Sequence, residues 1–87
     1  MNRNVLITGG AGFIGSNFAK HLLAHGASVR ILDNLARAGV EHNLAMLQQL
    51  GGSRLEFIKG DVRDADLVRD VVTGRDEIYH FAAQVAV

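Results

Sequence analysis

Hydrophobic residues follow two alternating patterns along the chain. Short runs rich in branched and aliphatic residues predict the buried strands of a parallel sheet, at residues 5–7, 28–32, 55–59 and 77–83. Between these runs, apolar residues recur every three or four positions and predict helices, over residues 16–25, 41–50 and 65 to about 72, the last with Asp64 as its N-cap. The chain is therefore expected to alternate strand and helix.

Each predicted helix has one apolar face that would pack on the sheet. The first is expected to bury Ile14, Phe18, Ala19, Leu22 and Leu23. The second is expected to bury Leu44, Leu47 and Leu50, with Met46 near them, and the third Leu67, Val68, Val71 and Val72. Gly26 and the pair Gly51-Gly52 are expected to end the first two helices.

This alternation predicts an α/β fold, a Rossmann-type doubly wound parallel sheet. With right-handed crossovers, four strands and three connecting helices give the strand order 3-2-1-4. Helices then cover both faces of the sheet, and the carboxyl ends of the strands form one edge, where such folds bind ligands.

A glycine-rich turn follows the first predicted strand. Gly9 is expected to turn the chain sharply at the end of the strand, and Gly12 to let a pyrophosphate approach the backbone. Gly15 would let the following helix pack close to the strand, while the amides of Phe13 and Ile14 face an anion at the helix start. A strand before and a helix after the glycines favour a dinucleotide site over a turn without a ligand.

An acid completes this pattern at the end of the second predicted strand. Asp33 lies eighteen positions after Gly15, and its carboxylate is expected to accept hydrogen bonds from the adenosine ribose. A carboxylate there would repel a 2′-phosphate, so it favours NAD over NADP, although nearby Arg37 could accommodate that phosphate. The alternative for Asp33 is a solvated turn acid that caps nothing.

Composition narrows the class of protein. The 87 residues are 48% hydrophobic and 21% charged with zero formal net charge, so one domain with no nucleic-acid partner and no membrane association is expected. The first residues lead directly into a strand, which argues against a signal peptide, and the absence of cysteine fits the reducing cytoplasm. His21 and His25 are one helical turn apart, but without a third ligand no metal site is expected.

The run Thr8-Gly9-Gly10-Ala11-Gly12-Phe13-Ile14-Gly15 resembles the signature of the extended short-chain dehydrogenase/reductase family, the nucleotide-sugar epimerases and dehydratases. This resemblance implies NAD as cofactor, a nucleotide-sugar substrate and a homodimer for the full-length protein. It implies further cofactor contacts by Asn34, by Asp61 and Val62 against the adenine, and by Ala82 and Ala83 on the nicotinamide side. The residues alone leave open whether Asp61 only stabilises its turn. His80 is expected to be structural, inside the packing of the sheet.

The family's chemistry needs a tyrosine base, a lysine four residues later, and a serine or threonine. None is identified here, since Tyr79 is followed four positions later by Ala83. No catalytic residue is therefore predicted, and residues 1–87 are expected to be the N-terminal part of an NAD-binding domain whose remainder, with the substrate domain, lies outside this chain.

Finer features resemble the CDP-tyvelose (CDP-paratose) 2-epimerases, which invert one sugar carbon by transient oxidation. These features are residues 33–37, the pair Asn43-Leu44, and residues 84–87. A nucleotide-sugar 4-epimerase and a 4,6-dehydratase remain alternatives. So does a different class of protein, a non-catalytic dinucleotide sensor or scaffold, because a fold does not fix a function.

Overall fold

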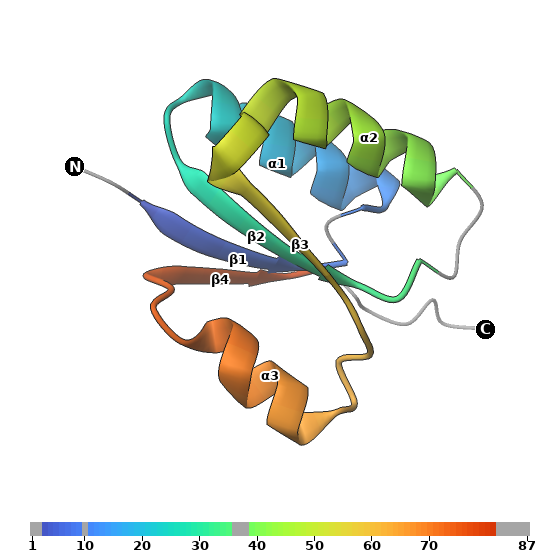
Figure 1. The fold of residues 1–87 in the computed structure, drawn as a ribbon, viewed down its shortest axis with the longest axis vertical. Helices are drawn as coiled ribbons and strands as arrows, with labels where there is room; N and C mark the ends of the chain where they lie inside the picture. Colours follow the sequence, from blue (N-terminus) through green and yellow to red (C-terminus); the bar gives the residue numbers. More distant parts are fainter. Residues whose placement is uncertain (1–2, 10, 36–38, 82–87) are drawn as a thin grey trace.

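The computed structural model describes residues 3–9, 11–35 and 39–81. Its elements alternate as the sequence predicts (Figure 1). In chain order they are β1 (Asn4–Thr8), α1 (Phe13–Ala24), β2 (Ser28–Asp33), α2 (Val40–Gly51), the 3-10 turn η1 (Gly52–Arg54), β3 (Leu55–Lys59), α3 (Ala65–Val72) and β4 (Glu77–His80). In the part of the chain that is described, no helix has the length and apolar character needed to cross a membrane.

The strands form one parallel sheet in the order β3-β2-β1-β4, which confirms the predicted topology. Val5 in β1 lies beside Val29 in β2 and beside Glu77 in β4, and Val29 lies beside Leu55 in β3. All four carboxyl ends therefore point to the same edge of the sheet, where the loops that follow the strands meet.

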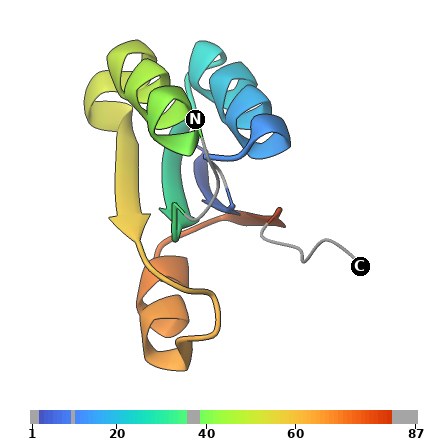
Figure 2. The ribbon, with the colours of Figure 1, turned by 90° about the vertical axis from the view of Figure 1, so that its right-hand side faces the viewer.

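Helices cover both faces of the sheet, as predicted. Figures 1 and 2 show α1 and α2 side by side on one face and α3 on the other. Successive residues of β1 face the helices on opposite sides of the sheet, because side chains alternate along a strand. Val5 and Ile7 belong to the core under α1 and α2, whereas Leu6 belongs to the smaller core under α3.

Helix α1 begins three residues earlier than the sequence predicts. Gly12 acts as its N-cap residue, and the Ser16 amide donates to the Gly12 carbonyl at 2.8 Å. Ile14 consequently lies in the first turn, beyond the sheet surface on which Leu22 packs, and is 65% exposed. Its predicted burial is therefore wrong, and the small residues Gly15 and Ser16 are buried instead.

The buried stripe of α2 also differs at its end. Leu44 and Leu47 are buried as predicted, but Leu50 is 44% and Met46 37% exposed. The stripe passes through Gly51 because α2 lies close to α1 there: a Cβ built on Gly51 would come within 2.9 Å of the Leu23 side chain. A glycine that permits this approach takes the core position that spacing alone assigned to Leu50.

The ends of the helices are closed by specific side chains. The Asp64 carboxylate accepts from the Leu67 amide at 3.2 Å, which confirms the predicted N-cap of α3. Gly26, with φ of +89°, follows α1 as predicted. Arg54 donates to the carbonyls of Leu23 and Ala27 at 2.9 and 2.8 Å, so a cation satisfies the end of α1.

A charged cluster joins the amino ends of β1 and β4. Arg3 donates to both carboxylate oxygens of Glu77, at 2.7 and 2.6 Å, and the Tyr79 hydroxyl donates to the same carboxylate at 2.7 Å. The hydrogen bonds from Arg3, then those from Tyr79, lower the pKa of Glu77 to about 2. Tyr79 is thus a strand residue with a structural role, as expected.

This cluster predicts an acid-sensitive contribution to stability. Because folding lowers the pKa of Glu77, its contribution is complete above the unfolded value of 4.5 and is lost as pH falls through about 2. Wild type should resist urea better than Glu77→Gln at about pH 6, and this difference in urea midpoint should shrink as the pH is lowered to about 2. Carboxyl groups titrate roughly between these two pH values.

The comparison of the two proteins at each pH isolates the contribution of Glu77, because the other carboxylates titrate in both proteins. Arg3→Met should change the same part of the profile, because it removes the cation that holds the pKa of Glu77 low. A constant difference between wild type and Glu77→Gln across this range would contradict the prediction.

Candidate dinucleotide-binding site

The glycine turn lies at the carboxyl end of β1. Gly9 has φ of +75°, a conformation that side chains disfavour, so the sharp turn predicted at this residue is present. The Gly9 amide donates to the Leu32 carbonyl at 2.7 Å, and the Gly12 amide donates back to the Gly9 carbonyl at 3.2 Å. These bonds hold the turn against the end of β2.

The start of α1 is open to an anion. Gly12 caps the helix with no side-chain hydrogen bond, and the first turn holds no acidic residue. A helix leaves its first amides unpaired, so those of Phe13 and Ile14 are available at the positive end of the helix dipole. A Cβ built on Gly12 would meet only the Gly9 carbonyl oxygen, at an ordinary 3.5 Å. The space above this glycine is therefore free for a ligand.

Side chains from two other elements hold the turn at Ala11, which is fully buried. The Ala11 amide donates to Oδ2 of Asp33 at 3.1 Å. Its carbonyl accepts from Nδ2 of Asn43, in α2, at 3.0 Å. Sequence reasoning assigned neither role; Asn43 entered only as part of a resemblance, and no local pattern pairs it with Ala11.

Asp33 connects three loops at the edge of the sheet. Besides Ala11, its carboxylate accepts from the Leu35 amide at 2.8 Å, and its backbone carbonyl accepts from the Gly60 amide at 3.1 Å. Asp33 thus stabilises its own turn through Leu35 and also holds Ala11 across the edge of the sheet; its contact with a ribose stays a prediction. An ionised carboxylate has about four acceptor positions, so Asp33 keeps capacity for the hydroxyls of a ribose.

The loop after β3 holds Asp61 and Val62. Arg63 donates to Asp61 from its backbone amide at 2.8 Å and from its guanidinium at 2.7 Å, and these bonds lower the pKa of Asp61 to about 2. Asp61 therefore has the turn-stabilising role that was one of its two predicted readings. Val62 is half-buried and packs beside the core under α3.

The structure brings most of the predicted site residues to one edge. Gly9, Gly12, Phe13, Ile14 and Gly15 follow β1, Asp33 and the exposed Asn34 end β2 or follow it, and Asp61 and Val62 follow β3. Ala82, Ala83 and Arg37 lie outside the described residues.

His80 ends β4 at the same edge and is exposed, so its predicted place inside the packing of the sheet is wrong. Its ring nitrogen Nδ1 lies 2.5 Å from the hydroxyl of Thr8, its neighbour in the sheet. Phe18 lies nearby at the sheet surface, with its ring 4.6 Å from Tyr79 and 5.7 Å from Phe81 in edge-to-face contacts. Strand alternation failed for His80 because, among the described residues, no helix covers this end of β4.

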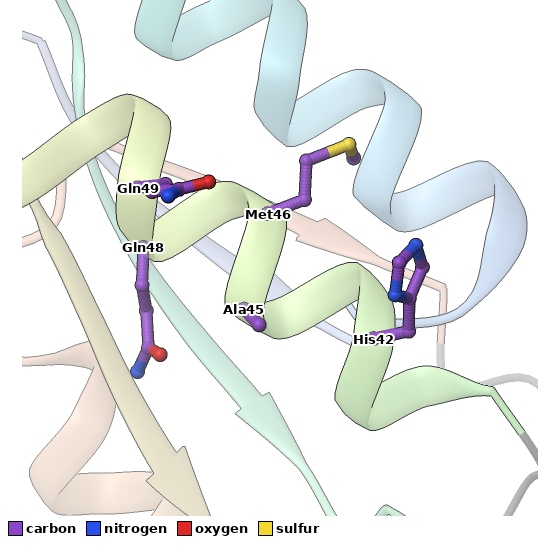
Figure 3. A pocket seen from close by; sticks show the side chains of 5 residues that line it. All are labelled: His42, Ala45, Met46, Gln48 and Gln49. Atoms are coloured by element: carbon purple, nitrogen blue, oxygen red, sulfur yellow. The ribbon is translucent and has the colours of Figure 1, made fainter.

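A shallow hollow of about 600 Å³ lies elsewhere, along α2 (Figure 3). Its lining comes from this single helix: His42, Ala45, Met46, Gln48 and Gln49. All five are exposed, and the glycine turn and Asp33 contribute nothing to it. Within the described residues, no group of three or more histidine, cysteine, aspartate or glutamate side chains could hold a metal ion.

A family model described as GDP-mannose 4,6 dehydratase matches residues 6–87. The chain is 46% identical over 89 residues to dTDP-glucose 4,6-dehydratase of Streptomyces niveus, covering 95% of this chain and 26% of the relative. It is 43% identical over 84 residues to CDP-paratose 2-epimerase of Salmonella typhi, covering 94% of this chain and 24% of the relative.

A solved structure shows the same arrangement. The UDP-glucose 4-epimerase of Stenotrophomonas maltophila, with bound NAD and formylated UDP-arabinopyranose, superposes with a TM-score of 0.81 and 34% identity. The match covers 98% of this chain and 26% of that protein. The chain thus spans about a quarter of the length of the relatives it matches.

Proposed function

The chain belongs to the GDP-mannose 4,6 dehydratase family, and on that premise we propose that it forms the NAD-binding part of a nucleotide-sugar epimerase or dehydratase. One observation carries the proposal: the Asp33 carboxylate at the end of β2 accepts from the Ala11 amide in the glycine turn at 3.1 Å. The acid and the turn required by a dinucleotide fingerprint are thereby joined in one site.

The proposed cofactor lies along the carboxyl edge of the sheet. Its pyrophosphate is placed over Gly12, at the amides of Phe13 and Ile14, where the helix dipole favours negative charge. Its adenosine ribose is placed at Asp33, and the adenine extends toward Asp61 and Val62 in the loop after β3. These three contacts follow one another along the edge because β1, β2 and β3 are neighbours in the sheet.

The same acid sets the choice of cofactor. The Asp33 carboxylate is held by the amides of Ala11 and Leu35, at 3.1 and 2.8 Å, so it cannot turn away from the ribose without breaking those bonds. A 2′-phosphate would bring two further negative charges to a fixed carboxylate, so NAD is favoured over NADP. Arg37, which could accommodate the 2′-phosphate of NADP, lies outside the described residues.

For the parent enzyme we propose the reaction of a CDP-sugar 2-epimerase. The resemblance to the 2-epimerases supports it, as does the similarity to the Salmonella typhi relative. The bound NAD supplies a hydride acceptor and donor, and this chain's residues bind and orient it. A 4-epimerase and a 4,6-dehydratase are the alternatives within the family, because relatives of both kinds match over the same residues.

The remaining parts of the proposal concern the longer protein. Residues 1–87 are its N-terminal part, with the rest of the NAD-binding domain, the substrate domain and the catalytic tyrosine and lysine beyond them. The parent is proposed to be a cytoplasmic homodimer that binds a nucleotide sugar. A non-catalytic dinucleotide sensor would share the same cofactor site and would differ by lacking the Tyr-x-x-x-Lys motif.

Calorimetric titration with NAD and, separately, NADP tests the cofactor site. We expect NAD to bind at least about tenfold more tightly, a difference of about 1.4 kcal/mol. Equal affinities would remove the proposed role of Asp33 in cofactor choice. The absence of binding to both, in the folded full-length protein, would contradict the whole assignment.

A further inference from the structure

Asn43 contacts the glycine turn from outside the cofactor site. It lies in the first turn of α2, where its backbone amide donates to the Gly39 carbonyl at 3.3 Å. Its side-chain amide donates to the carbonyl of Ala11 at 3.0 Å, in a partly buried setting. Ala11 itself is fully buried, so in the folded chain this carbonyl depends on Asn43 as its side-chain donor.

This hydrogen bond fixes a peptide plane that matters for an anion. The carbonyl of Ala11 and the amide of Gly12 belong to one planar trans peptide unit, so they point in opposite directions. Holding the carbonyl toward Asn43 therefore also holds the Gly12 amide, which donates to the Gly9 carbonyl at 3.2 Å. A rotated peptide would break both bonds and turn the Ala11 carbonyl oxygen toward the Gly9 carbonyl oxygen, so the turn that places Gly12 below the proposed pyrophosphate would lose its shape.

The anchor is rigid because α2 is packed firmly. Val40, Leu44 and Leu47 on either side of Asn43 are buried at 3%, 8% and 0% exposure, and α2 lies beside α1. The Ala11 amide is held in the opposite sense by Asp33 at 3.1 Å. Side chains from two elements thus fix the turn: Asp33 in β2 and Asn43 in α2. Of these two residues, only Asp33 has a proposed contact with the cofactor.

We propose that Asn43 is a positioning residue for the phosphate-binding turn, which it shapes for a pyrophosphate without touching the cofactor. The inference rests on the proposed NAD site and adds a residue that the dinucleotide fingerprint does not contain. It also gives a physical reason for an asparagine ten positions after the ribose-binding acid.

Two substitutions and three ligands test this role in the protein. Asn43→Asp keeps the shape but replaces the donating amide by an ionised acceptor, and Asn43→Ala removes the group. Both should weaken NAD and ADP by about tenfold, about 1.4 kcal/mol, and weaken adenosine, which has no phosphate, less than about twofold. Gln48→Ala, which truncates an exposed amide on the same helix, should change none of the three affinities.

The ligand series separates positioning from a general structural effect. Equal losses for adenosine and NAD, or loss of the folded state in both variants, would overturn the inference, because Asn43 would then act on the whole fold. NAD affinity unchanged in Asn43→Asp would overturn it as well, because the donated bond would be unnecessary. A wild-type protein that binds none of the three ligands would instead refute the proposed NAD site on which the inference rests.

Discussion

Replacing Gly12 by valine should abolish dinucleotide binding and leave the fold nearly unchanged. Gly12 has φ of −72° and ψ of 177°, angles that valine adopts readily. The first side-chain carbon would meet only the Gly9 carbonyl oxygen, at 3.5 Å. The added methyl groups therefore extend into the space proposed for the pyrophosphate and not into the core. We expect an affinity loss of about a hundredfold or more, about 2.7 kcal/mol.

The measurement pairs calorimetry with thermal unfolding. Gly12→Val should lose NAD binding and retain adenosine binding, and it should lower the free energy of unfolding by about 1 kcal/mol, because valine caps a helix less well than glycine. Gly12→Ala, with a smaller side chain, should give an intermediate loss of NAD affinity. Undiminished NAD binding in Gly12→Val would show that the pyrophosphate does not approach this backbone.

Replacing Asp33 by alanine should weaken NAD binding and relax discrimination against NADP. The substitution removes the proposed acceptor for the ribose and the acceptor for the amides of Ala11 and Leu35. NAD should lose about a hundredfold in affinity and NADP less, since the repulsion of its 2′-phosphate disappears at the same time. Stability should fall by about 1–3 kcal/mol for each amide left buried without a partner.

Two further variants separate these effects. Asp33→Asn keeps one acceptor oxygen, so it should retain more stability than Asp33→Ala while still weakening NAD. Asp70→Asn makes the same change of net charge at an exposed position in α3 and should alter neither affinity. A ratio of NAD to NADP affinity that stays at its wild-type value in Asp33→Ala would argue against the ribose contact.

Local patterns predicted most of the fold. The strand from Leu55 to Lys59 matches its prediction at both ends, because a short apolar run bounded by glycines and charges has few alternatives. The start of α1 was predicted three residues late, because Gly12 caps the helix through its backbone and leaves no side-chain signal in the sequence. Burial failed at Ile14 and Leu50, where helical spacing gives the direction of a side chain but not where the sheet or the neighbouring helix ends.

Part of the candidate site could likewise be predicted from the sequence, and part could not. Asp61 and Arg63 are two positions apart, so their pairing follows from local geometry and was one of the readings available from sequence. The bonds from Ala11 to Asp33 and Asn43 span 22 and 32 positions. They depend on where the crossover brings β2 and α2 beside the glycine turn, which periodicity does not encode.

The layering of the sheet has a consequence for local opening of the native state. In β1 four successive residues from Val5 to Thr8 are buried, with cores on both faces, whereas the edge strand β4 has Ile78 54% exposed. Regions with few buried contacts open at lower free energy than the centre of a core. Among the four strands described in this chain, amide hydrogen exchange should therefore be faster along β4 than along β1, so the glycine turn follows a strand that opens rarely.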